Sequence, residues 1–94
     1  MRLTPQQAQL ISQNVHRHLG KNARMWLFGS RLSDQKRGGD LDLYVEADPH
    51  PLMDELRCKI QLEEALDLPV DLVVRAPGDQ GPIANIAKAE GIAL

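Results

Sequence analysis

The sequence has few of the residues that stabilise small folds by special means. It contains a single cysteine, Cys58, among its 94 residues, so no disulfide can form within the chain. Only 3% of the residues are aromatic, namely Trp26, Phe28 and Tyr44. The length indicates one domain over residues 1–94, and its core must be mostly aliphatic. Because Cys58 falls in an expected helix, we interpret it as an ordinary buried or half-buried thiol.

Long hydrophobic runs and a large excess of one charge are also missing. The N-terminal residues lack the apolar run of a signal peptide, and no stretch approaches the length that spans a membrane. The expectation is therefore a soluble, cytoplasmic protein. With 11 basic and 13 acidic residues, the formal net charge of −2 argues against nucleic-acid binding through a basic surface. A domain of this size buries a modest share of its surface, which is compatible with a partner subunit or a homo-oligomer.

Apolar spacing and helix-end signals predict three helices. The first begins at Thr4–Gln7, where threonine, proline and glutamine form an N-cap pattern, and ends at Gly20. The second covers 52–66, with one apolar side made of Met53, Leu56 and Ile60. The third lies between Gly81 and Gly91, and we expect its inward residues to be Ile83, Ile86 and Ala87.

Three short apolar or alternating segments predict strands at 25–28, 41–45 and 70–74. The resulting order is α-β-β-α-β-α. It predicts a two-layer α+β fold in which helices cover a small sheet. Because no helix separates the first two strands, the sheet should be mixed.

Two aspartates in the second strand suggest a metal site. Residues two apart in a strand point to the same side, so Asp40 and Asp42 present neighbouring carboxylates. Like charges at this spacing repel unless a divalent cation neutralises both, and carboxylate oxygens suit Mg²⁺ or Mn²⁺. A pair of this kind alone is weak evidence, because exposed strands also carry it by chance.

Two further features make the pattern more specific. Gly29 and Ser30 end the first strand, where glycine allows close backbone approach and free N–H groups bind anions; Arg31 adds a positive charge for phosphates. In the third strand, alternation places Asp71 on the face opposite Val70 and Leu72. If this strand neighbours the second, three carboxylates converge, which suffices to bind metal and to share a second metal or accept a proton.

A phosphate-binding turn, a metal-binding pair and a third aspartate are the parts needed for phosphoryl or nucleotidyl transfer. Together they resemble the DNA polymerase β-like nucleotidyltransferase superfamily. The short chain is similar to its minimal nucleotidyltransferases, the MNT-type proteins often encoded beside a HEPN-domain partner. The resemblance spans nearly the whole chain and is strongest over Trp26–Glu46, which includes the segments WLFGSRL and GDLDLYV.

The resemblance implies a nucleotidyltransferase fold and a role for each motif residue. Gly29 and Ser30 would hold the phosphates of ATP or another nucleoside triphosphate, while Asp40, Asp42 and Asp71 would bind catalytic Mg²⁺. The family reaction moves a nucleoside monophosphate onto a hydroxyl and releases pyrophosphate. MNT-type members of toxin–antitoxin pairs act as antitoxins, and some adenylylate a tyrosine of the HEPN toxin.

The sequence departs from the family pattern beside these motifs. Gly39 stands where the family usually has serine, and Leu32 stands where a small or polar residue is common. These changes bear on substrate preference and rate more than on metal binding.

Other interpretations stay open. The chain could be an antitoxin that neutralises its partner by complex formation alone, without catalysis. Polymerisation or end modification of nucleic acid is disfavoured by the acidic charge balance. Near the motifs, Tyr44 shares the carboxylate face and could line the site or pack under a helix, while Glu46 and His50 are expected to be solvated.

Overall fold

The structure of the protein is a computed structural model that describes residues 3–28 and 41–94. It confirms the predicted order of helices and strands and adds one short strand at the end of the chain. The elements are α1 (Pro5–Leu19), β1 (Arg24–Phe28), β2 (Leu41–Glu46), α2 (Leu52–Leu66), β3 (Val70–Arg75), α3 (Pro82–Glu90) and β4 (Ile92–Ala93). In these two ranges, no helix combines the length and apolar character that crossing a membrane requires.

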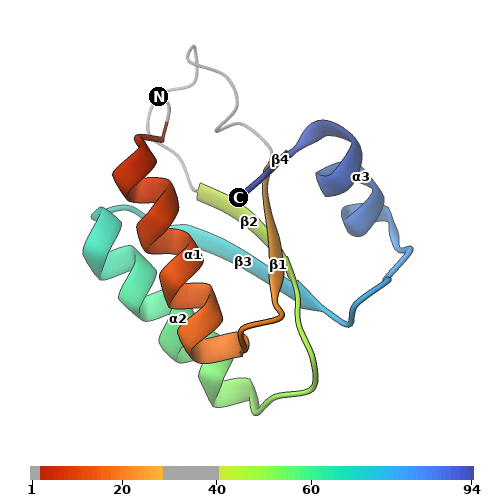
Figure 1. Ribbon diagram of the computed structural model, residues 1–94, viewed down its shortest axis with the longest axis horizontal. Helices are drawn as coiled ribbons and strands as arrows, with labels where there is room; N and C mark the ends of the chain where they lie inside the picture. The colour runs from red at the N-terminus through yellow and green to blue at the C-terminus, as the bar shows by residue number, and fades with distance from the viewer. Residues whose placement is uncertain (1–2, 29–40) are drawn as a thin grey trace.

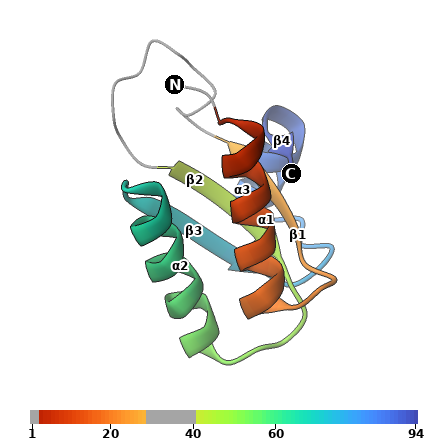
Figure 2. The same ribbon diagram turned by 60° about the vertical axis from the view of Figure 1, so that its left-hand side comes forward.

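The strands form one mixed sheet, which confirms that prediction, and their order in the sheet is β3-β2-β1-β4. Strand β1 is antiparallel to both β2 and β4, whereas β2 and β3 are parallel and joined through α2. Helices α1 and α2 lie side by side over one face of the sheet, and α3 lies on the opposite face (Figures 1 and 2). The two faces therefore have separate apolar clusters.

Helix α1 begins and ends where the sequence signals indicate. The Thr4 hydroxyl accepts a hydrogen bond from the Gln7 backbone N–H at 3.1 Å, and the Gln7 side chain accepts one from the Thr4 N–H at 2.9 Å. This reciprocal capping box satisfies two N–H groups that a helix start leaves without partners. At the other end Gly20 has a φ of 108°, a conformation that favours glycine.

The main core lies between the sheet and the pair α1 and α2. Its fully buried members come from both helices and from alternate strand positions: Ile11, Val15, Leu41, Leu43, Val45, Cys58 and Leu62. The prediction for Cys58 is confirmed, since it is completely buried and burial raises the pKa of its thiol to about 11. A thiol in this environment behaves as a small apolar side chain.

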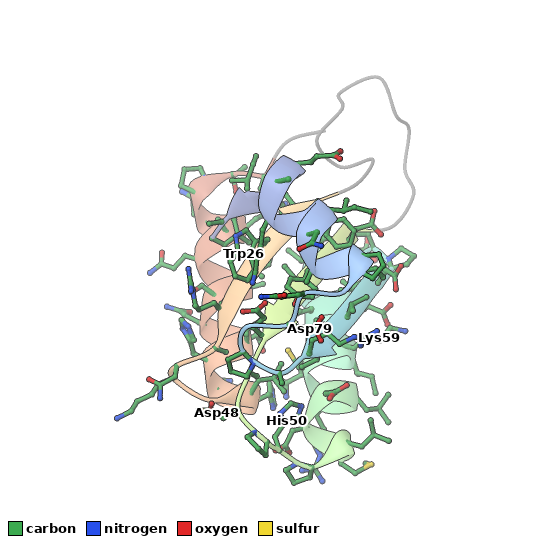
Figure 3. All side chains as sticks on the ribbon, turned by 90° about the vertical axis from the view of Figure 1, so that its right-hand side faces the viewer. Trp26, Asp48, His50, Lys59 and Asp79 are labelled. Atoms are coloured by element: carbon green, nitrogen blue, oxygen red, sulfur yellow. The ribbon has the colours of Figure 1, made fainter. Side chains whose placement is uncertain are left out.

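A smaller cluster lies beneath α3. Trp26 and Tyr44 pack there with their ring centroids 5.7 Å apart, against Ala84 and Ala87 of the helix. Figure 3 shows Trp26 under this helix. Of the two possibilities for Tyr44, packing under a helix is therefore the observed one.

The prediction for the inward face of α3 is right for Ala87 and wrong for the two isoleucines. Ile83 and Ile86 are 37% and 46% exposed, while Ala84 is buried. The reason is steric: the Trp26 and Tyr44 rings fill the space above the sheet, so the helix presents its small side chains to them.

Helix α2 also carries apolar side chains away from the core. Cys58 and Leu62 face inward. The side predicted as apolar is instead largely solvent-exposed, together with one leucine of the first turn: Leu52 76%, Met53 52%, Leu56 47% and Ile60 44%. The periodicity correctly placed these residues on one side of the helix, but that side faces outward.

Candidate functional site

The sheet brings two of the predicted site aspartates together. Asp42 of β2 and Asp71 of β3 are register partners in the parallel pair. Strand spacing places such partners roughly 4.8 Å apart at the backbone, with side chains on the same face. Alternation confirms that face: Val70 and Leu72 belong to the α1–α2 side, and Val73 belongs to the α3 side with Asp71. Asp42 is half-buried and Asp71 is exposed.

Both aspartates lie at the end of their strands that adjoins the last residue of β1. Phe28, the last residue of β1, is the register partner of Asp42. Residues 29–40 connect Phe28 to Leu41, and they lie outside the described residues. The predicted phosphate-binding residues Gly29, Ser30 and Arg31 and the predicted metal ligand Asp40 belong to that segment, so their placement stays a prediction.

Asp42 and Asp71 fit part of a magnesium site by their chemistry. Carboxylate oxygens are hard ligands, and Mg²⁺ in nucleotide sites is held by one or two protein carboxylates together with substrate phosphates. In the described ranges, no group of three or more His, Cys, Asp or Glu side chains could hold a metal ion. A three-carboxylate site therefore depends on Asp40, which stands two residues before Asp42 in the sequence and lies outside the described residues.

The opposite end of the same sheet face holds a buried charge cluster. Glu46 is only 3% exposed, so the expectation that it is solvated is wrong. Its carboxylate accepts a hydrogen bond from the Tyr44 hydroxyl at 2.8 Å and one from the Gly78 N–H at 3.2 Å. The Lys88 ammonium of α3 lies 2.5 Å from the same carboxylate and 5.3 Å from the centre of the Trp26 ring.

These contacts determine the ionisation of the cluster. Burial by itself would raise the pKa of Glu46, but the Lys88 ammonium, the Tyr44 hydroxyl and the Gly78 N–H outweigh it and hold that pKa below its usual value. Burial and the adjacent Glu46 carboxylate raise the pKa of the Tyr44 hydroxyl well above its usual value. Tyr44 therefore remains a neutral hydrogen-bond donor, and the cluster anchors α3 to the sheet.

His50, after the end of β2, is also less solvated than expected. Its side chain is only 14% exposed. Nδ1 donates to the Asp48 carbonyl at 2.6 Å, and Nε2 donates to the Glu55 carboxylate at 2.7 Å. The Asp48 carbonyl and the Glu55 carboxylate raise the pKa of His50 against the opposing effect of burial. Figure 3 places His50 and Asp48 together, away from the helix that covers Trp26.

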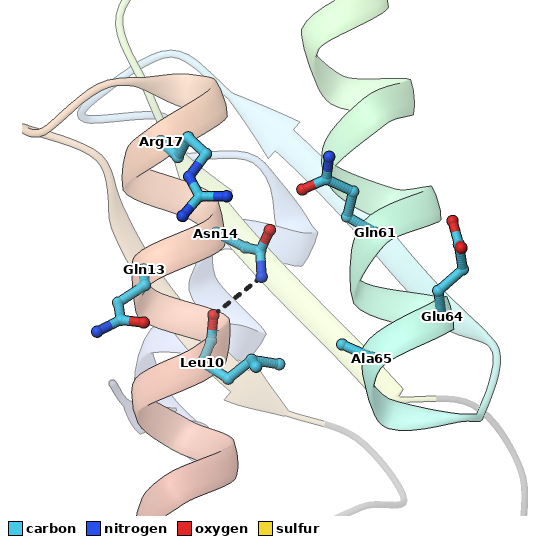
Figure 4. Close-up of a pocket in the computed structure, with 7 residues that line it drawn as sticks. All are labelled: Leu10, Gln13, Asn14, Arg17, Gln61, Glu64 and Ala65. Atoms are coloured by element: carbon cyan, nitrogen blue, oxygen red, sulfur yellow. Dashed lines mark hydrogen bonds between the residues drawn. The ribbon is translucent and has the colours of Figure 1, made fainter.

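A separate groove of about 530 Å³ lies between α1 and α2 (Figure 4). Its lining is mixed in character: Leu10, Gln13, Asn14, Arg17, Gln61, Glu64 and Ala65. Within it, the Asn14 amide donates to the Leu10 carbonyl at 3.2 Å. The groove belongs to the face covered by α1 and α2, so it is separated by the sheet from Asp42 and Asp71.

The family assignment follows from comparison with known proteins. Residues 9–94 match the family model of the nucleotidyltransferase domain. The chain belongs to this family. The match begins inside α1 and runs to the last residue, so it includes every strand and both aspartates at the β1 end of the sheet. Among curated proteins, none matches the chain significantly.

Three solved structures share the nucleotidyltransferase fold of this chain. The first, the toxin–antitoxin MntA–HepT with a tyrosine-to-alanine substitution, has a TM-score of 0.72 at 25% identity and covers 93% of this chain and 69% of that chain. The same pair with two aspartate-to-glutamate substitutions has a TM-score of 0.73 at 24% identity, covering 93% and 70%. A third MntA–HepT structure has a TM-score of 0.59 at 23% identity, covering 90% and 69%. The predicted fold is thereby confirmed.

Proposed function

We propose that this nucleotidyltransferase-domain protein is an antitoxin that transfers a nucleoside monophosphate, with AMP as the expected group, from its triphosphate onto a hydroxyl of a HEPN-type toxin. The observation that carries the proposal is the register pairing of Asp42 with Asp71 on one face of the sheet. Their position beside the end of β1, which Gly29 and Ser30 follow in the sequence, supports a shared site for metal and phosphates.

The family supports the transfer chemistry, and the similar structures support the partner. The nucleotidyltransferase-domain match covers residues 9–94. The structure at 25% identity is a toxin–antitoxin, MntA–HepT, which makes a toxin the expected binding partner of this chain as well. The described surface carries exposed apolar side chains on α2 and α3, as expected of a protein that binds another chain.

Each carboxylate has a defined role in the proposed reaction. Asp42 and Asp71, with Asp40, would hold Mg²⁺, or Mn²⁺ in its place. The ion supplies charge neutralisation for the triphosphate. The acceptor hydroxyl forms a new bond to the α-phosphorus, the bond to pyrophosphate breaks, and pyrophosphate leaves. The hydroxyl proton passes to a carboxylate, for which Asp71 is suited because its side chain is exposed on this face.

Transfer of label from ATP labelled at its α-phosphate tests the proposal. The chain is co-purified with the protein encoded beside it and incubated with Mg²⁺, and label on either protein is measured. We expect label on the neighbour, and we expect Asp42→Asn to abolish it because the amide cannot bind the cation as a carboxylate does. Asp48→Asn is the matched control, because Asp48 is an exposed aspartate beyond the opposite end of β2.

Circular dichroism shows whether the Asp42→Asn chain is folded, since the substitution is nearly isosteric. Labelling by a folded Asp42→Asn chain at the wild-type rate would contradict the assigned site. A complex that forms but never becomes labelled would favour the second candidate function, an antitoxin that acts by binding alone. The likeness to a toxin–antitoxin structure favours that candidate equally, because complex formation does not require catalysis.

A further inference from the structure

Strand β3 lies at one edge of the sheet, with β2 on its inner side. Within the described residues, no strand pairs with its outer side. Two hydrogen bonds define which backbone groups point inward: the Pro69 carbonyl accepts from Leu41 N–H at 2.9 Å, and the Arg75 carbonyl accepts from Ala47 N–H at 3.0 Å. Since backbone groups alternate along a strand, the N–H and C=O groups of Leu72 and Val74 point outward.

The two ends of this outer edge are partly covered by side chains. The Glu63 carboxylate accepts from the Val70 N–H at 2.9 Å, and the Arg75 guanidinium donates to the Val74 carbonyl at 3.0 Å. For Leu72, between these positions, no side chain among the described residues hydrogen-bonds to the backbone groups. Edge strands of this kind are templates for pairing with another chain.

Apolar side chains of α2 lie beside the same edge. A groove of about 270 Å³ is lined by Leu52, Glu55, Leu56, Lys59 and Leu72. Leu52 is 76% exposed and Leu56 is 47% exposed. Helix α2 runs along the outer strand β3 on the face of the sheet that α1 and α2 cover (Figure 2). A chain that pairs with β3 would therefore also cover apolar surface.

We propose that the occupant is a second copy of this chain, whose β3 pairs antiparallel with this one about a two-fold axis at Val73. Leu72 of one copy then lies opposite Val74 of the other, and these are the residues whose backbone groups point outward. Asp71 lies opposite Arg75 of the second copy, twice in the dimer. Shifting the register to centre on position 71 or 75 would oppose two aspartates or two arginines, which is unfavourable. Centring it on position 72 or 74 would leave both Asp71 and Arg75 opposite uncharged residues, so the Val73 register is the one that gains the ion pairs.

The proposed pairing changes two contacts of the single chain. Each Arg75 guanidinium moves from the Val74 carbonyl of its own copy to the Asp71 carboxylate of the second copy. The freed Val74 carbonyl then accepts a hydrogen bond from the Leu72 N–H of the second copy. The two-fold axis also brings the exposed leucines of both α2 helices toward each other. The second copy thereby contributes Arg75 to the candidate site, where a carboxylate has oxygens enough for a guanidinium and a cation.

Mass measurement by light scattering during size-exclusion chromatography tests the dimer without any assay of nucleotidyl transfer. We expect twice the mass of one chain for the wild type. Arg75→Asp should weaken the dimer roughly tenfold or more, because two attractive pairs become repulsive. The combined variant Asp71→Arg/Arg75→Asp should restore it. Arg17→Asp, with the same charge change on α1, should remain dimeric.

Disulfide trapping tests the register separately. Partners that are not hydrogen-bonded lie about 4.5 Å apart at Cα, within the range a disulfide spans. Val73→Cys should therefore form a covalent dimer on oxidation. Asp71→Cys should not, because the two copies of that position lie roughly 13 Å apart along the strands. A wild-type chain that is monomeric at high micromolar concentration, or a folded charge-swap variant that stays monomeric, would overturn the proposal.

Discussion

Removing the Lys88 ammonium should destabilise the protein more than removing an ordinary exposed lysine would. Glu46 is 3% exposed, and Lys88 supplies the positive charge 2.5 Å from its carboxylate. Breaking a buried ion pair costs about 3–5 kcal/mol when the remaining charge has no compensation. Here the lysine side chain is 35% exposed, so water already screens part of the interaction. Tyr44 and Gly78 also keep their hydrogen bonds to the carboxylate. We expect Lys88→Met to lower the free energy of unfolding by about 2–3 kcal/mol at pH 7.

The pH dependence of that loss identifies its cause. The pKa of Glu46 in the folded wild type is below its usual value, so its ionisation stabilises the fold above the unfolded pKa of about 4.5 and this contribution is lost as pH falls through the folded pKa. Without Lys88, the largest influence that opposes burial is gone, so the pKa of Glu46 is higher in the variant than in the wild type. As the pH falls, protonation of Glu46 then removes the poorly compensated buried charge from the variant. The stability difference between wild type and Lys88→Met should therefore narrow from pH 7 to pH 4.

Urea unfolding followed by far-UV circular dichroism measures the difference at both pH values. Fluorescence is less suitable, because Lys88 lies over the ring of Trp26, the single tryptophan. All samples are kept at one concentration, since a dimer would make stability concentration-dependent. Lys21→Met, an exposed lysine after α1, is the control and should change stability by less than about 0.5 kcal/mol. A Lys88→Met loss as small as the control's, or one independent of pH, would refute the reasoning.

Three further predictions concern single contacts. Thr4→Ala should cost about 1 kcal/mol of stability by removing one half of the capping box, whereas Thr4→Ser should cost far less; equal losses would refute the capping role. Cys58, whose thiol pKa is raised to about 11 by burial, should react with a thiol reagent at pH 8 only after denaturation, and rapid labelling of the native chain would contradict its burial. Because the folded pKa of His50 is raised, its stabilisation is complete below the unfolded pKa of about 6.5 and is lost as pH rises through the folded pKa. His50→Ala should therefore destabilise the protein more at pH 5.5 than at pH 8.5, and a pH-independent loss would exclude the ionic contact with Glu55.

Much of the fold could be predicted from local patterns. The capping pattern at Thr4–Gln7 and the stop at Gly20 define α1, and alternation in 41–45 and 70–74 correctly assigned the faces of β2 and β3. Strand β4, two residues long, was missed because Ile92–Ala93 is too short to show alternation. It forms by pairing with β1, a partner far away in the sequence.

The candidate site was predicted in the same way, from residue types and from the alternation of side chains between the two faces of a strand. Asp42 and Asp71 had to share a face if their strands were neighbours, and the parallel register makes them partners. Nothing local distinguished Glu46 from a solvated strand-end carboxylate. The available signal was that Glu46 lies two residues after Tyr44 in the strand, so both side chains point to the face that α3 covers.

The sequence by itself determined the elements, their order and the face that each strand residue occupies, because these depend on backbone periodicity and on residues a few positions apart. Only the tertiary structure decided which helix covers which face of the sheet and how closely it packs there. That packing buried Glu46 under Lys88 and turned Ile86 outward by presenting Ala87 to the aromatic rings. Such outcomes depend on contacts between segments distant in the chain, for which a local pattern carries no information.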